Sequence, residues 1–130
     1  MNTGTIINIV AIALISWFIY SRFKPAKGLK TLSAEQFKTE MAGAGKPVVI
    51  DVREPGEYKG GYIAGAKNVP LSQFARRLSD IPKDRPVLLY CRSGMRSKSA
   101  AKILLKSGYR DLAHLQGGLS GWNGKLASKA

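Results

Sequence analysis

The residue best suited to chemistry in this chain is Cys91, its one cysteine. It directly follows Val87-Leu88-Leu89-Tyr90, a short apolar run that predicts a buried strand, and a helical pattern begins at Ser97. Open α/β sheets place their ligand sites at the carboxyl ends of their strands. A free cysteine is most often a small core residue. This position instead favours a reactive cysteine, whose nucleophilic form is the thiolate.

The loop after Cys91 carries groups that favour a thiolate. Backbone N–H groups in such a loop can turn inward and form an anion-binding nest. The helix N-terminus that follows adds a partial positive charge. Arg92 and Arg96 add full charges, and Gly94 allows a backbone conformation that other residues avoid.

The same spacing argues against two other kinds of site. Cysteine-dependent phosphatases use Cys-x5-Arg, but here Ser97 stands six residues after Cys91 and the arginine comes one residue earlier, at Arg96. A phosphatase or arsenate reductase is therefore disfavoured. One cysteine excludes an intramolecular disulfide and a cysteine-rich zinc site, and the presence of only one histidine, His114, argues against a metal cluster. We expect His114 to pack or face solvent rather than act as a base.

Strands and helices alternate in the elements that must position this loop. Strands are predicted at 48–52, 67–69, 87–90 and 111–115. Helices are predicted from the capping box at Ser33 to Met41, over 72–78 and 97–106, and in a final short segment containing Trp122. The linker 24–30 and the turn at 54–57 complete the pattern. This order predicts an α/β fold, a parallel sheet covered by helices on both faces.

Several motifs in sequence order resemble the rhodanese-like (thiosulfate sulfurtransferase) family over about residues 31–125. They are Asp51-Val52-Arg53-Glu54 with Glu57-Tyr58, Gly61-Tyr62-Ile63-Ala64-Gly65-Ala66-Lys67-Asn68-Val69-Pro70, Cys91-Arg92-Ser93-Gly94-Met95-Arg96-Ser97, and Gly117-Gly118 followed by Trp122. The resemblance implies a five-stranded parallel sheet flanked by helices. It also implies that Cys91 is the nucleophile that accepts sulfur. The residues that the resemblance places in the substrate-binding cradle are Arg92, Ser93, Gly94, Met95, Arg96 and Ser97.

The implied reaction moves sulfane sulfur from thiosulfate or a persulfide donor, through a Cys91 persulfide, to an external thiol or protein acceptor. It needs no metal or organic cofactor. A sulfur-relay or persulfide-carrier module with little thiosulfate turnover is the alternative. Asp51 and Arg53 end a strand at the same edge as Cys91, where they either touch substrate or form a buried salt bridge. Relatives usually carry His where this chain has Tyr62, and we expect Tyr62 to be structural.

The N-terminal segment has a different composition. Residues 1–21 carry no charge, and 13 of the 16 residues from Thr5 to Tyr20 are apolar. A helix over Thr3–Arg22 would span roughly 30 Å, the thickness of a bilayer core. A buried core helix would need a partner of matching size, and a cleaved signal peptide would carry its basic residues before the apolar run. The sequence therefore predicts a transmembrane anchor over 1–23, a basic linker over 24–30 and the rhodanese-like domain over 31–127.

The basic residues bear on topology and partners. Arg22 and the linker lysines follow the apolar run, so the positive-inside rule predicts a single-pass protein of the cell (inner) membrane, with its N-terminus outside and its domain cytoplasmic. The chain carries a net charge of +13. For a tethered domain, attraction to the lipid bilayer accounts for this charge. No nucleic-acid motif accompanies it, so nucleic acid is not expected as a partner.

Overall fold

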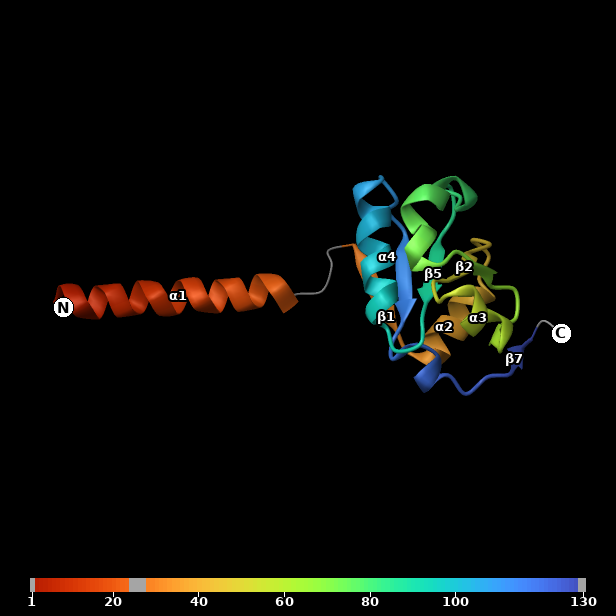
Figure 1. Ribbon diagram of the computed structural model, residues 1–130, viewed down its shortest axis with the longest axis horizontal. Helices are drawn as coiled ribbons and strands as arrows, with labels where there is room; N and C mark the ends of the chain where they lie inside the picture. Colours follow the sequence, from red (N-terminus) through yellow and green to blue (C-terminus); the bar gives the residue numbers. More distant parts are fainter. Residues whose placement is uncertain (1, 24–27, 129–130) are drawn as a thin grey trace.

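The computed structural model describes residues 2–23 and 28–128, which form one N-terminal helix and one α/β domain (Figure 1). The helix, α1, covers Thr3–Phe23, and the domain opens with strand β1, Leu29–Leu32. Part of the predicted linker, 24–27, lies outside the described residues. Lys30, predicted as linker, belongs to β1.

The domain is built on a parallel sheet of five strands, as predicted. The other four strands are β2 (Val48–Asp51), β4 (Lys67–Asn68), β5 (Val87–Tyr90) and β6 (Leu112–Leu115). Their order is β1-β6-β5-β2-β4, and every neighbouring pair is parallel. The central strand β5 is buried along its whole length, which explains its continuous apolar run.

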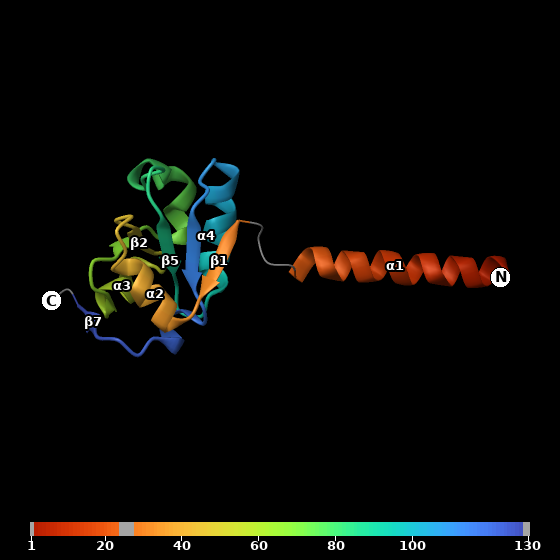
Figure 2. The same cartoon turned by 180° about the vertical axis from the view of Figure 1, so that it is seen from behind.

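Helical segments cover both faces of the sheet and enclose two apolar clusters. On one face, α4 (Met95–Lys106) and the 3-10 helix η1 (Leu71–Asp80) pack over a cluster that includes Leu89 and Cys91. On the other face, α2 (Ala34–Met41) contributes Phe37 to a cluster that includes Leu88 and Tyr90. Figure 1 shows α4 on the near side, and α2 comes forward in Figure 2. Residues of β5 alternate between the clusters, so Cys91 continues the α4 side.

The predicted helices form, with shifted boundaries. The capping box of α2 is present, with Gln36 N donating to Ser33 Oγ at 3.2 Å and Ser33 N donating to Gln36 Oε1 at 2.9 Å. Helix α4 begins at Met95, two residues early, because Gly94 is its N-cap. The predicted final helix is a short 3-10 helix, η2 (Gly118–Gly121), so the expectation that it contains Trp122 was wrong.

Trp122 follows η2 directly and packs edge-on against Phe37, with ring centroids 6.0 Å apart. Four elements were not predicted: strand β1, helix α3 (Pro55–Lys59), and the antiparallel pair of β3 (Tyr62–Ile63) and β7 (Leu126–Ala127). The β3–β7 pair brings the C-terminal segment of the described chain beside the glycine-rich connection before β4.

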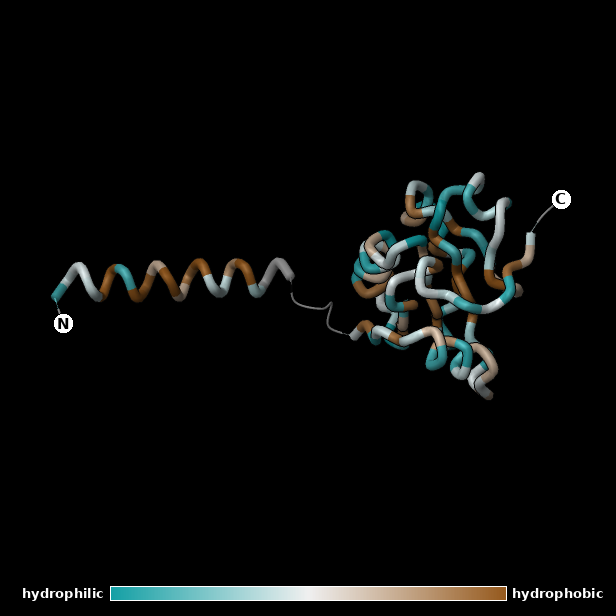
Figure 3. The backbone as a smooth tube through the Cα atoms, turned by 90° about the horizontal axis from the view of Figure 1, so that it is seen from below, coloured by the Kyte–Doolittle hydropathy of each residue, from teal (hydrophilic) through white to brown (hydrophobic). Residues whose placement is uncertain are grey.

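Helix α1 stands apart from the domain (Figure 3). It is the one described helix that is long and apolar enough to cross a membrane, over the window Thr3–Tyr20, and none of that window is buried. A signal sequence or the core helix of a soluble protein can meet the same length and composition.

Candidate active site

Cys91 lies at the carboxyl end of β5, where the chain turns into α4. Its Sγ accepts a hydrogen bond from the backbone N–H of Gly94 at 2.9 Å, and it lies 3.7 Å from Ser97 Oγ. Gly94 adopts φ of 102°, a left-handed conformation that a residue with a side chain would hold only under strain. The turn therefore depends on glycine to aim its amide at the sulfur.

The loop after Cys91 is held from the opposite side by η2. Leu119 N donates to the Cys91 carbonyl at 2.9 Å, while Ser120 donates to the Arg92 carbonyl through its N at 3.1 Å and its Oγ at 2.9 Å. Gly118 makes this approach possible, because a Cβ there would lie 2.4 Å from the Cys91 carbonyl oxygen. These contacts fix the backbone that surrounds the sulfur.

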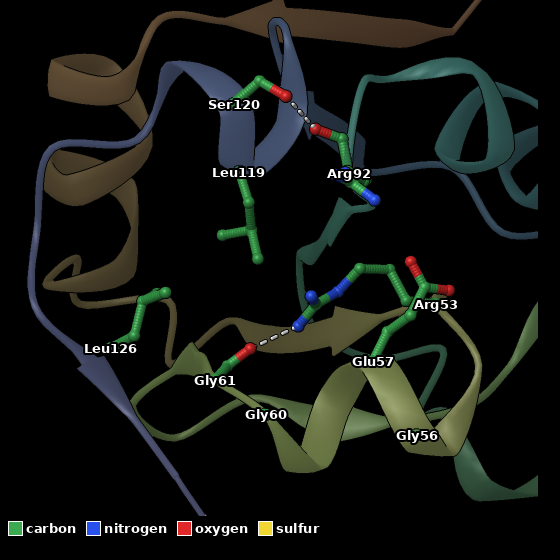
Figure 4. A pocket seen from close by; sticks show the side chains of 9 residues that line it. All are labelled: Arg53, Gly56, Glu57, Gly60, Gly61, Arg92, Leu119, Ser120 and Leu126. Atoms are coloured by element: carbon green, nitrogen blue, oxygen red, sulfur yellow. Dashed lines mark hydrogen bonds between the residues drawn. The ribbon is translucent and has the colours of Figure 1, made fainter.

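A cavity of about 520 Å³ opens beside this loop (Figure 4). Its lining residues are Arg53, Gly56, Glu57, Gly60, Gly61, Arg92, Leu119, Ser120 and Leu126. The Arg92 side chain is exposed at the cavity, where it can meet an anion from solvent. Cys91 itself is fully buried and does not line the cavity. The next residue, Arg92, does line it, so the cavity lies beside the nucleophile candidate without exposing its sulfur.

The other predicted cradle residues take different positions. Ser97 is buried beside the sulfur, whereas Ser93 and Met95 are exposed. Arg96 is paired with Glu57, with its two terminal nitrogens 2.6 and 3.0 Å from the carboxylate oxygens. Those hydrogen bonds lower the pKa of Glu57 to about 2. They also raise the pKa of Arg96, and a charge on Cys91 acts in the same direction. Arg96 thus anchors the loop to α3.

Asp51 and Arg53 form a buried salt bridge at the neighbouring strand end. Arg53 Nη2 lies 2.7 Å from Asp51 Oδ2, and the same nitrogen donates to the Gly61 carbonyl at 2.6 Å (Figure 4). Asn68 Nδ2 donates to the carbonyls of both Asp51 and Arg53. The pair therefore ties β2 to the glycine-rich connection, while Arg53 also lines the cavity.

Tyr62 lies outside this cavity. Its ring stacks on Tyr58, with centroids 4.1 Å apart and planes 18° from parallel. Tyr58 in turn donates to the Ala66 carbonyl at 2.7 Å. This packing supports the structural role expected for Tyr62.

The sequence alone gives no role in the site to His114, expected to pack or face solvent, or to Glu57, named only within a family motif. His114, in the middle of β6, is buried, and its Nδ1 lies 2.9 Å from Ser97 Oγ. Glu57 is the partner of Arg96. Neighbouring residues in the sequence do not indicate these contacts, because both side chains reach the loop or its helix from distant segments of the chain. Within residues 2–23 and 28–128, no group of three or more His, Cys, Asp or Glu could hold a metal ion.

Comparison with known proteins places the chain in a family. Residues 33–125 match the model of the rhodanese-like domain. The chain is 43% identical over 127 residues to YqhL of Bacillus subtilis, an uncharacterized protein, with 98% of each chain covered. It is 36% identical over 91 residues to a sulfurtransferase of Allochromatium vinosum, covering 70% of this chain and 85% of that protein.

Solved structures agree on the fold. A rhodanese-like domain protein from Staphylococcus aureus superposes with a TM-score of 0.65 at 27% identity, covering 78% of this chain and 99% of its own. The match spans nearly all of that protein, so the sheet and its flanking helices form a complete unit of the shared fold.

Proposed function

The chain belongs to the rhodanese-like family, and from that premise we propose that it is a membrane-anchored sulfurtransferase with Cys91 as its nucleophile. The observation that carries the proposal is the hydrogen bond from Gly94 N–H to Cys91 Sγ, at 2.9 Å. It puts a donor on the sulfur at a strand end, beside a cavity that carries Arg92. The substrates would be sulfur donors and acceptors, with thiosulfate as the simplest donor.

The reaction needs two displacements at sulfur. The Cys91 thiolate attacks the outer sulfur of thiosulfate, the S–S bond breaks, and sulfite leaves with the electron pair. An external thiolate then attacks the terminal sulfur of the Cys91 persulfide, takes that sulfur and returns the Cys91 thiolate. The chain has no second cysteine, so the acceptor must come from outside.

Three groups support the charges in this scheme. The Gly94 amide faces the sulfur, and a fixed amide stabilises a sulfur anion without reorganising during the reaction. The Ser97 hydroxyl lies 3.7 Å from the same sulfur. Arg92 attracts the incoming dianion at the cavity. The pairing of Arg96 with Glu57 leaves Arg92 as the loop arginine that can move toward the donor.

Access to the sulfur is part of the proposal. Because Cys91 has no exposed surface, the structure around it must open before a donor can reach Sγ. The rate of alkylation by a small neutral reagent measures that movement separately from the chemistry. We expect slow but complete alkylation of the folded chain.

Mass spectrometry after treatment with thiosulfate tests the function. The wild-type chain should gain one sulfur atom, and the matched Cys91→Ser variant should gain none. Absence of sulfur uptake together with hydrolysis of an aryl phosphate would refute the proposal. Turnover with thiosulfate and cyanide then separates an enzyme from a relay module, since a relay takes up the sulfur but turns over slowly.

We also propose that α1 is the membrane anchor. Its apolar window is exposed along its whole length, and Arg22, Lys24 and Lys27 follow it in sequence. The expected orientation puts Asn2 outside and the domain in the cytoplasm.

Because Cys91 is buried and is expected to react slowly, exposed cysteines report the orientation better than this residue does. Two new cysteines in a Cys91→Ser background serve instead, Asn2→Cys and Lys102→Cys, both at exposed positions. An impermeant thiol reagent added to intact cells should label the first and spare the second. The reverse pattern would overturn the orientation, and extraction of the chain by alkaline carbonate would overturn the anchor.

A further inference from the structure

A buried histidine that the sulfur-transfer scheme does not use is connected to the nucleophile through side chains. Both ring nitrogens of His114 have hydroxyl partners: Nδ1 lies 2.9 Å from Ser97 Oγ, and Nε2 lies 3.1 Å from Thr31 Oγ1. Ser97 Oγ lies 3.7 Å from Cys91 Sγ. A continuous series of contacts therefore runs from Thr31, exposed on edge strand β1, across the strands to the sulfur.

The strand register creates this series. His114 pairs with Thr31 of β1 and with Leu89 of β5, so all three side chains point to the face covered by α4. Cys91 follows Leu89 by two residues and joins the same face, and Ser97 enters from the first turn of α4.

Counting donors and acceptors assigns the protons. Ser97 Oγ also donates to the Gly94 carbonyl at 3.0 Å, and that oxygen can only accept. A hydroxyl has one proton, so Ser97 must accept from both Cys91 S–H and His114 Nδ1–H. The ring then carries its proton on Nδ1, and Nε2 accepts from the Thr31 hydroxyl. Burial, and behind it the charge of Lys98, lowers the pKa of His114, so the neutral ring is the form present at neutral pH.

Ionisation of Cys91 changes what Ser97 must do. A thiolate only accepts, so the Ser97 proton turns from the Gly94 carbonyl to the sulfur. That carbonyl keeps a partner, because Lys98 N donates to it at 3.4 Å. The donors at Thr31, His114 and Ser97 then all point toward the sulfur, and hydrogen bonds aligned in this way strengthen one another.

We infer that His114, held by Thr31, is a positioning residue that acts through Ser97 to direct a hydroxyl donor onto the ionised sulfur of Cys91. This role builds on the proposed sulfur transfer, in which the same donor serves the thiolate that attacks and the persulfide that follows. In this role His114 acts through Ser97 and not on the substrate.

The pH midpoint of Cys91 alkylation in the full-length chain is the direct readout. Slow access lowers the rate at every pH and leaves the midpoint in place. Loss of a hydrogen bond to a charged group shifts the midpoint of its ionisation by roughly one pH unit or more. Ser97→Ala should therefore raise the alkylation midpoint by about that amount. His114→Leu should raise it by about half a unit, and Thr31→Val by less.

The variants leave the other charges near the site unchanged: Lys98 on α4, Arg92 and the Arg96–Glu57 pair in the loop and α3, and the Asp51–Arg53 pair on β2. His114→Asn is the conservative control, because its amide nitrogen can replace Nδ1 as a donor to Ser97 but does not titrate. We expect it to restore most of the midpoint. Thr31 is exposed, so Thr31→Val provides a test that does not depend on core packing.

Two results support the inference: the order of shifts given above, and no further shift when His114→Leu is added to Ser97→Ala. It is overturned if the two substitutions add, if Asn shifts the midpoint as far as Leu, or if Thr31→Val and His114→Leu both leave it unchanged. Alkylation does not require sulfur transfer, so failure of thiosulfate to load Cys91 would count against the proposed function alone.

Discussion

Gly118 is the position where one added carbon should disturb the loop after Cys91 most directly. A Cβ built there lies 2.4 Å from the Cys91 carbonyl oxygen and 2.5 Å from the Arg92 carbonyl carbon, both rigid backbone atoms. Gly118→Ala therefore forces η2 and the loop apart. The neighbouring Gly117 is the matched control, because it also has positive φ, 71° against 58°, but a Cβ there meets nothing within 4 Å.

Both substitutions place a side chain in the left-handed backbone region, but only Gly118→Ala also creates a steric clash. A residue with a Cβ in the left-handed region costs about 1–2 kcal/mol, which applies to both glycines. Only Gly118→Ala adds the cost of overpacking, about 1–3 kcal/mol. It also strains the hydrogen bonds from Leu119 and Ser120 to the loop carbonyls. The variants should thus differ by about 1–3 kcal/mol in the free energy of unfolding, or about 5–20 °C in Tm for a domain of this size.

Thermal unfolding of the full-length chain in mild detergent, followed by near-ultraviolet circular dichroism, measures this difference. The rate of Cys91 alkylation gives a second readout, since a displaced loop should expose the sulfur in Gly118→Ala and leave it covered in Gly117→Ala. Equal losses of stability in the two variants, with unchanged alkylation, would show that the close approach of Gly118 does not hold the loop.

Three further predictions concern the charges and the packing around the cavity. Arg92→Ala should lower kcat/KM for thiosulfate about 10- to 100-fold through loss of a charged hydrogen bond, and Arg92→Lys should recover part of it in a steady-state assay. Glu57 has its pKa lowered to about 2, so its pair with Arg96 contributes stability above the ordinary pKa of 4.5 and loses it as pH falls toward 2. Both side chains are about one-third exposed, so Glu57→Gln should cost less than about 1 kcal/mol in urea unfolding at neutral pH, and the difference from wild type should disappear in acid. Tyr62→Phe should keep the stack on Tyr58, whereas Tyr62→Ala should lower the free energy of unfolding by about 0.5–1.5 kcal/mol in addition to the effect of lost burial. Tyr62→His should leave turnover unchanged, because the ring lies outside the cavity.

The features predictable from sequence depend on neighbours along the chain. A run of four apolar residues fixes β5, and the helical pattern after Ser97 fixes α4, so the placement of Cys91 between them follows directly. The capping box at Ser33 is equally local. Gly94 moved the start of α4 to Met95 because its positive φ lets the turn close earlier than the apolar pattern indicates.

The contacts that the sequence could not predict join distant segments. Arg96 and Glu57 are 39 residues apart, and the pairing needs α3 to lie across from the loop. His114 reaches Ser97 only because the register of β6 against β5 and β1 aims its ring at α4. The β3–β7 pair likewise depends on where the C-terminal segment returns. Local sequence patterns do not predict the strand register or where the C-terminal segment packs, because both depend on the packing of the whole domain.

The parallel sheet also determines how an anchored domain would present its cavity. Strand β1 begins at Leu29, so the chain enters the domain from α1 at the amino ends of the strands. Phe23 and Gly28 are five residues apart and can be separated by no more than about 18 Å. Cys91 lies at the carboxyl ends, across the full length of the strands. In a parallel sheet these two edges are opposite, so an anchor at one edge would leave the other facing away from the membrane, which is the cytoplasmic side in the proposed orientation. Soluble donors and acceptors would then reach the cavity without passing between the domain and the lipid.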